Sequence, residues 1–149
     1  MSVKLDSVIA PSFYELHDDI RNDRYTHYVL TGGRGSTKSS VVSVELILGL
    51  IKHPDAHAIV LRKVSNTLHD SVFAQLLWAI ETLGLSEYFK VAISPLKITY
   101  KPTGQTILFR GADDPMKIVC PVGLYVILRG LIATLKYSDK PNVSIAHSN

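Results

Sequence analysis

The chain has 149 residues, a length that suits one domain with a hydrophobic core and hardly two. Apolar residues make up 46% of it and charged residues 19%, which excludes an intrinsically disordered chain. The net charge of +3 permits a polyanionic partner without requiring one. A single cysteine, Cys120, excludes an internal disulfide and fits a reducing compartment.

Signals for export or membrane insertion are weak. The N-terminal residues Met1–Asp6 lack the apolar core of a secretion signal. The most apolar stretch, residues 118–135, is interrupted by a proline, two glycines and an arginine and barely reaches the ~20 residues that a membrane-spanning helix needs. We therefore expect a cytoplasmic protein with no membrane partner.

The first predicted unit is a strand, a glycine-rich loop and a helix. Thr26–Leu30 contains Tyr and Val and runs into a glycine cluster, which is typical of a strand that enters a loop. Residues 38–52, KSSVVSVELILGLIK, are apolar almost all round and predict a helix packed against a sheet. Pro54 ends that helix, and the apolar segment Ala56–Leu61 predicts a second strand, as in parallel βαβ units.

A second helix is predicted from Ser65 or Asn66, either of which suits a helix N-cap. Between Phe73 and Ile80 apolar residues recur at i, i+3, i+4 and i+7, and Gly84 closes the pattern. Trp78 on this helix is expected in the core or at a packing edge, not as a platform for stacking bases.

From Leu96 the apolar period changes to two. A turn at 101–104 then leads to alternating apolar residues up to Phe109, which predicts a β-hairpin. The following loop contains Asp113–Asp114, expected to be solvated acids of a turn and not a catalytic pair. Beyond Ile118 the pattern assigns no elements.

The segment TGGRGSTKSS, from Thr31 to Ser40, has the residues of a phosphate-binding loop. Such a loop needs glycines, whose backbone turns its amides inward, and a helix N-terminus, whose dipole favours an anion. The strict pattern is Gly, four free positions, Gly, Lys, then Ser or Thr, and Thr37 stands where the second glycine belongs. A flexible turn with a chance Lys-Ser pair is the alternative.

Each role in phosphate binding has a candidate residue. Gly32, Gly33 and Gly35 supply the backbone freedom. Lys38 is placed to reach the β and γ phosphates, and the hydroxyl of Ser39 to hold Mg²⁺.

The octapeptide Gly32–Ser39 resembles the P-loop of the large terminase subunits of tailed bacteriophages, in which a Gly-Gly-Arg-Gly-Ser opening is typical and the residue before the lysine varies. Segments 59–72 and 109–118 are similar to successive segments of the same family, so that the likeness runs from about Tyr25 to Ile118. The resemblance implies an incomplete α/β P-loop NTPase fold, with a mainly parallel sheet flanked by helices and a β-hairpin.

Members of that family are ATP-driven motors that thread double-stranded viral DNA into a capsid, with an N-terminal ATPase domain and a C-terminal metal-dependent nuclease. The resemblance implies ATP and Mg²⁺ as cofactors, the small terminase subunit and the portal as partners, and a homo-oligomeric ring. It implies cofactor binding by Gly32, Gly33, Gly35, Ser36, Thr37, Lys38 and Ser39, with Ser39 as the Mg²⁺ ligand. Arg34 is a candidate for stabilising the γ-phosphate, the alternative being a surface cation.

Hydrolysis also requires an apolar strand that ends in Asp, followed by Glu, and no such strand is recognisable. After Ile118 the first acid is Asp139. We therefore expect residues 1–118 to be a partial ATPase domain, residues 119–149 to be a divergent tail of a truncated or frameshifted gene product, and ATP to be bound in preference to being hydrolysed. The alternatives are an inactive prophage remnant and an unrelated P-loop enzyme such as a small-molecule kinase.

Other residue pairs give weaker indications of a functional site. His53 and His57 have the spacing of a helical metal site, but Pro54 lies between them and breaks the helix. Asp18–Asp19 is expected to be solvated. Arg62–Lys63 follows the second predicted strand, where open α/β sheets often bind ligands.

Overall fold

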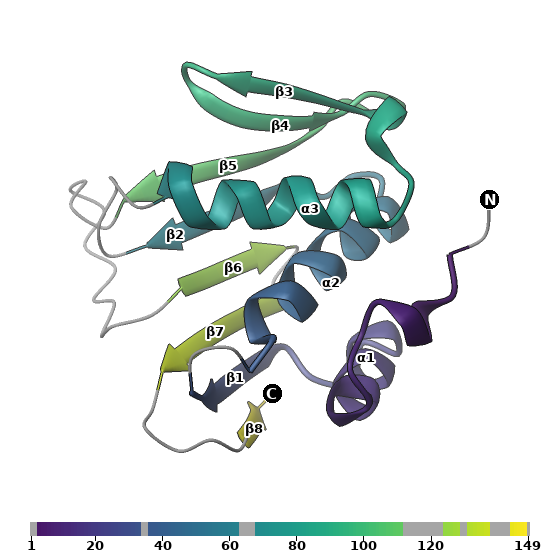
Figure 1. Cartoon of the computed structure of the whole chain (residues 1–149), viewed down its shortest axis with the longest axis vertical. Helices are drawn as coiled ribbons and strands as arrows, with labels where there is room; N and C mark the ends of the chain where they lie inside the picture. The colour runs from purple at the N-terminus through teal and green to yellow at the C-terminus, as the bar shows by residue number, and fades with distance from the viewer. Residues whose placement is uncertain are drawn as a thin grey trace.

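The computed structural model describes residues 3–33, 36–62, 68–111, 124–128, 131–137 and 144–148. Within them it is an α/β fold with an eight-stranded mixed sheet (Figure 1). The strands are β1 (His27–Gly32), β2 (Ala58–Arg62), β3 (Phe89–Ile93), β4 (Leu96–Tyr100), β5 (Gln105–Gly111), β6 (Leu124–Leu128), β7 (Leu131–Tyr137) and β8 (Ser144–Ser148). The α-helices are α1 (Tyr14–Arg21), α2 (Lys38–Lys52) and α3 (Ala74–Thr82), with 3-10 turns at Leu5–Ser7, Pro11–Phe13 and Ser86–Tyr88 and a π-helical segment at Leu68–Phe73.

The strand order is β3-β4-β5-β2-β6-β7-β1-β8. Of the seven pairings between described strands, only β1 with β7 and β2 with β5 are parallel. The expectation of a mainly parallel sheet is therefore wrong. The turns that join β3, β4 and β5 are too short for a helical crossover and so impose antiparallel pairing, while β6 enters antiparallel between β2 and β7.

Five strands nevertheless point the same way. Because β6 is antiparallel to both β2 and β7, these two strands are parallel to one another; β5 and β1 follow them, and β3 follows β5 because β4 is antiparallel to both. The carboxyl ends of β1, β2, β5 and β7 therefore meet at one end of the sheet, on the left of Figure 1. We call this the carboxyl end of the sheet, the place where open α/β sheets bind ligands.

Helix α2 lies in front of the sheet beside α3 (Figure 1) and is apolar almost all round, as the sequence predicts. Val44, Ile47 and Leu50 on it are fully buried, in one core with residues of the central strands such as Val60 and Ile107. This burial fixes the direction of α2 and hence the position of its first turn.

The end of α2 is held by a buried side chain from β5. Gln105 is 1% exposed, and its Nε2 donates hydrogen bonds to the carbonyl oxygens of Leu50 (2.8 Å) and Ala56 (2.7 Å) and also to that of His53. The carbonyls at a helix C-terminus have no partner within the helix, so Gln105 caps α2 from the sheet.

The second predicted helix is present, but it opens with the π-helical segment Leu68–Phe73, and its expected N-cap at Ser65 or Asn66 lies outside the described residues. The predicted end is at the right place. Gly84 has φ +70° and its amide donates to the carbonyl of Glu81 (2.9 Å). Trp78 is 39% exposed, at the edge of the helix packing and not in its core.

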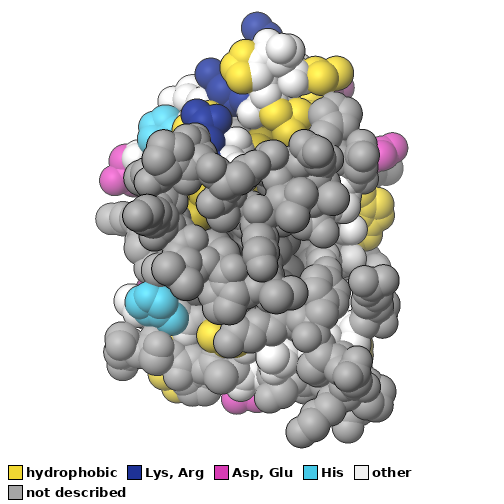
Figure 2. Space-filling model, turned by 90° about the vertical axis from the view of Figure 1, so that its left-hand side faces the viewer, with side chains coloured by type: hydrophobic (Ala, Val, Ile, Leu, Met, Phe, Trp, Pro, Cys, Tyr) yellow, Lys and Arg dark blue, Asp and Glu magenta, His cyan; other side chains and the backbone are white. Residues whose placement is uncertain are grey.

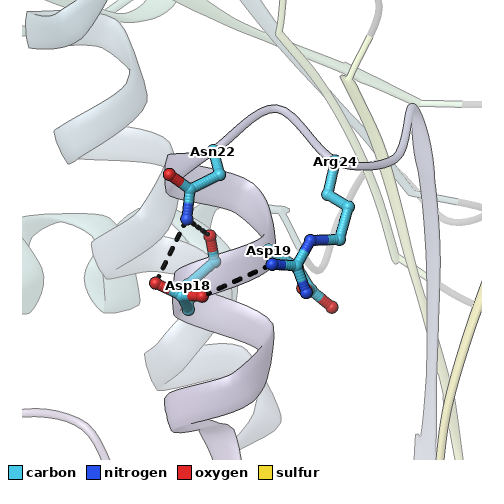
Figure 3. Close-up of polar contacts among 4 residues, drawn as sticks. All are labelled: Asp18, Asp19, Asn22 and Arg24. Atoms are coloured by element: carbon cyan, nitrogen blue, oxygen red, sulfur yellow. Dashed lines mark hydrogen bonds and ion pairs between the residues drawn. The ribbon is translucent and has the colours of Figure 1, made fainter.

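The expectation that Asp18–Asp19 is solvated is wrong for one of the two acids. Asp19 is buried, and its Oδ1 accepts a hydrogen bond from Arg24 Nη1 at 2.7 Å, whereas Asp18 is exposed (Figure 3). The side chain of Asn22 donates to Asp18 Oδ1 and to its carbonyl oxygen. These contacts fix the turn between α1 and β1, which sequence reasoning did not identify.

None of the described helices is long and apolar enough to cross a bilayer. Within the apolar stretch 118–135, the residues that the structure describes belong to strands β6 and β7.

Candidate nucleotide-binding site

The glycine-rich loop joins the end of β1 to the start of α2 at the carboxyl end of the sheet (Figure 1). Gly32 is the last residue of β1 and Lys38 the first of α2. The strand, loop and helix predicted from the sequence are thus confirmed. Arg34 and Gly35, two of the predicted site residues, lie outside the described residues.

The Lys38 side chain folds over this loop. Its Nζ donates hydrogen bonds to the carbonyl oxygens of Gly32 and Gly33, both at 2.9 Å, and to Ser36 Oγ. The hydroxyl of Ser36 in turn donates to the Gly33 carbonyl at 2.8 Å. Lys38 is only 2% exposed, and these oxygens satisfy a buried ammonium group that would otherwise be costly to desolvate.

Thr37 precedes α2 with φ 59° and ψ 10°, in the left-handed region. Its carbonyl oxygen accepts the first hydrogen bond of the helix, from the amide of Val41 at 3.1 Å. A β-branched residue is strained in this conformation, which costs about 1–2 kcal/mol and which glycine adopts freely. The backbone at Thr37 therefore has a left-handed conformation that glycine, the residue expected at this position of a phosphate-binding loop, adopts without strain.

The start of α2 provides the electrostatics of an anion site. The first amides of a helix have no carbonyl partner within it, and the dipole of this 15-residue helix places partial positive charge there. Lys38 adds a full charge at the same point, and Ser39 follows in the first helical turn with a partly buried side chain. Gly33, Ser36, Thr37, Lys38 and Ser39 thus lie together around one helix N-terminus.

Strand β7 borders the loop and was not recognised from the sequence. It runs parallel to β1, with Tyr137 paired to Gly32, so that it ends beside the place where the loop begins. In the sequence the first acid after Ile118, Asp139, comes two residues after Tyr137, and it lies outside the described residues.

Of the remaining candidates, His53 and His57 contact residues outside this cluster. Arg62 ends β2, paired with Gly111 of β5, and Lys63 lies outside the described residues, as does Asp113–Asp114. His57 Nδ1 contacts Thr106 Oγ1 at 2.9 Å, whereas His53 lies 3.9 Å from Asp23, so the two histidines face different partners. Among the described residues no group of three His, Cys, Asp or Glu side chains is placed to hold a metal ion.

Helix α2 also carries a buried acid that sequence reasoning missed. Glu45 Oε1 lies 2.6 Å from Nδ1 of His17 on α1, and Glu45 is 5% exposed. Burial raises the pKa of the Glu45 carboxyl, and the hydrogen bond with His17 offsets part of this rise. A single Glu within an apolar helix was the only signal in the sequence.

The family model for the phage terminase large subunit matches residues 24–138. The chain belongs to this family. The terminase chain is 41% identical over 116 residues to the terminase large subunit of Bacillus phage SPP1, an alignment that covers 78% of the chain and 27% of the relative. It is 37% identical over 110 residues to the PBSX phage terminase large subunit of Bacillus subtilis (strain 168), covering 74% of the chain and 24% of the relative.

The terminase chain thus spans about a quarter of the length of these curated relatives. No solved structure matches it significantly. The matched range includes the glycine-rich loop and runs past Ile118 through strands β6 and β7.

Proposed function

We propose that this terminase chain binds ATP with Mg²⁺ at the loop between β1 and α2 as part of the motor that packages viral DNA into the capsid in the host cytoplasm. The P-loop NTPase fold is part of this proposal. The observation that carries it is the position of Lys38, whose ammonium group lies over the loop against the carbonyls of Gly32 and Gly33 at the N-terminus of α2.

The proposal assigns roles to the described residues of the glycine-rich loop and of the first turn of α2. The triphosphate accepts hydrogen bonds from the amides of Gly33 to Ser39, and it takes over the ammonium group of Lys38 from the loop carbonyls. The hydroxyl of Ser39 holds Mg²⁺. Ser36, which bonds both Lys38 and Gly33, holds the Lys38 side chain over the loop.

Calorimetric titration with Mg²⁺ and ATP tests this proposal in the wild-type chain and in Lys38→Met, which retains an apolar stem in the buried position. Lys52→Met, at the other end of the same helix, is the matched control. We expect wild type and control to bind alike and Lys38→Met to lose at least about tenfold in affinity, since a charge-assisted contact to phosphate contributes roughly 1.5–3 kcal/mol. Equal affinity in all three chains contradicts the proposal.

Turnover is a separate question, because hydrolysis requires an acid beside the loop to hold Mg²⁺ and activate water. Asp139 is the first acid in the sequence after β7, the strand that borders β1. Release of phosphate by the wild-type chain that falls in Asp139→Asn, with ATP affinity unchanged, supports turnover. ATP binding without phosphate release in both chains supports a chain that binds nucleotide and has no hydrolytic centre of its own.

A further inference from the structure

The strands β3, β4 and β5 form an antiparallel meander at one side of the sheet. From Phe89 to Gly111 the sequence contains four cations, Lys90, Lys97, Lys101 and Arg110, and neither Asp nor Glu. The net charge of the whole chain is only +3, so this segment is a concentrated source of positive charge.

The register of the strands places three of these cations on the same face. Lys90 pairs with Thr99, and Lys97 pairs with Leu108. Directly paired residues share a face and residues two apart along a strand do so as well, so Lys90, Lys97 and Arg110 lie on one side of the meander. We call the side formed by Lys90, Lys97, Thr99, Thr106, Leu108 and Arg110 the basic meander face.

The opposite side of the meander faces the core. Ile98, Ile107 and Phe109 are buried there, in the same core as α2 and α3. On the basic meander face Lys90 and Arg110 are exposed and Lys97 is partly exposed. The cations are therefore available to a partner, and their charge has no acidic neighbour within the three strands.

Arg110 also lies close to the carboxyl end of the sheet, next to the end of β2, where Leu61 is its partner in the register. Figure 2 views the molecule from this end and shows Lys and Arg side chains gathered at the top, where the meander lies. The charge thus reaches the same end of the sheet as the glycine-rich loop.

We propose that the basic meander face binds the phosphate backbone of double-stranded DNA without regard to sequence. Lysine and arginine contact phosphates as charges and donors, and Thr99 adds a hydroxyl group of the kind that also contacts phosphate oxygens. The choice of duplex DNA as the polyanion rests on the proposed packaging function, whereas the cationic surface itself rests on the register and the sequence.

The test measures the affinity of a fluorescent random-sequence duplex for the chain between 50 and 200 mM salt, a range over which phosphate contacts weaken steeply. The triple variant Lys90→Gln, Lys97→Gln, Arg110→Gln removes the basic meander face. Lys101 is kept because its Nζ donates to the carbonyl of Glu87 at 2.9 Å. The control variant Lys4→Gln, Arg21→Gln, Lys52→Gln lowers the net charge equally at positions outside the meander.

We expect the meander variant to lose roughly tenfold or more in DNA affinity at low salt. Its plot of log affinity against log salt is expected to be shallower than that of wild type by about 2–3, since each phosphate contact contributes about 0.9 to the slope. The control variant is expected to stay close to wild type. Equal weakening in both variants means that net charge alone binds DNA, and it overturns the proposal, as does a wild-type chain that does not bind the duplex.

Two further measurements keep the outcomes distinct. If thermal unfolding shows the triple variant to be unfolded, Lys90→Gln and Arg110→Gln are measured singly, each with an expected decrease in salt slope of about one. ATP titration of the meander variant is expected to match wild type, while Lys38→Met keeps its DNA affinity. If the meander variant binds DNA as tightly as wild type while Lys38→Met still loses ATP affinity, this inference is overturned and the proposed nucleotide site stands.

Discussion

Nδ1 of His17 on α1 lies 2.6 Å from Oε1 of Glu45 on α2, and this contact joins the N-terminal helix to the helix that follows the glycine-rich loop. The carboxyl group is almost completely buried, and burial is the main cause of its raised pKa. The stability of the fold therefore depends on pH at this position.

We predict that Glu45→Gln gains stability relative to wild type as the pH rises. The folded pKa of Glu45 lies above its ordinary value of 4.5, so the folded state holds the proton more tightly than the unfolded chain does. The stability due to this proton is complete below about pH 4.5 and is lost as the pH rises through the raised folded pKa. The change is at most about 1.4 kcal/mol per pH unit.

Urea unfolding from pH 4.5 to 7 measures this effect. Glu15→Gln, at an exposed position of α1, is the control substitution. A difference between Glu45→Gln and wild type that is constant or falls with pH contradicts the assignment.

We predict that Thr37→Gly stabilises the chain by about 0.5–1 kcal/mol. Glycine removes the strain of a left-handed threonine, which outweighs the entropy that glycine adds to the unfolded state. Thr82→Gly at the end of α3, where the backbone is helical, is expected to lose stability instead. Thermal unfolding distinguishes the two, and a loss of stability in both would show that Thr37 is not strained.

We predict that Gln105→Leu destabilises the chain by about 2–3 kcal/mol. The substitution leaves the carbonyls of Leu50 and Ala56 without their side-chain donor in a buried place. Thr103→Val removes only the hydroxyl that donates to Gln105 Oε1 at 2.6 Å, and we expect a smaller loss of about 1 kcal/mol. Equal losses in a denaturant titration would show that Gln105 does not cap α2.

We predict that Tyr28→Phe is neutral or stabilising by about 1 kcal/mol. Tyr28 is 1% exposed, and its hydroxyl makes no well-formed hydrogen bond among the described residues, only a weaker contact with the backbone of Tyr25. Removing a poorly satisfied buried hydroxyl relieves its desolvation cost. A fall in the free energy of unfolding on this substitution, measured by urea titration, would show that the hydroxyl is well bonded.

The local pattern of the sequence was sufficient for the part of the fold that positions the loop. The strand, the glycine cluster and the apolar helix 38–52 predict β1, the loop and α2 because each depends on neighbouring residues only. The hairpin of β4 and β5 was predicted for the same reason. Gly84 ended a helix where its positive φ is needed.

What the sequence did not indicate depends on contacts between distant residues. Strand β3, FKVAI, is short and leaves Val91 and Ile93 exposed, so it lacks a clear alternation. Strands β6 and β8 pair antiparallel with β2 and β1, and this depends on contacts between distant segments and not on the local sequence pattern. The burial of Asp19 likewise depends on Arg24, which reaches it from beyond the end of α1.

At the site, the sequence named the residues and the structure supplied their geometry. Thr37 was the weak point of the loop pattern because glycine is expected there, and its left-handed backbone could be seen only in three dimensions. The roles of Gly33, Ser36, Lys38 and Ser39 toward a nucleotide stay predictions.

The most direct test of the proposed function is to follow the backbone amide resonances of the chain by NMR during titration with ATP and Mg²⁺. We predict that the largest shifts fall on Gly33 to Ser39 and the first turn of α2, and that they require the Lys38 side chain. Shifts that spare these amides, or that persist unchanged in Lys38→Met, would contradict nucleotide binding at this loop.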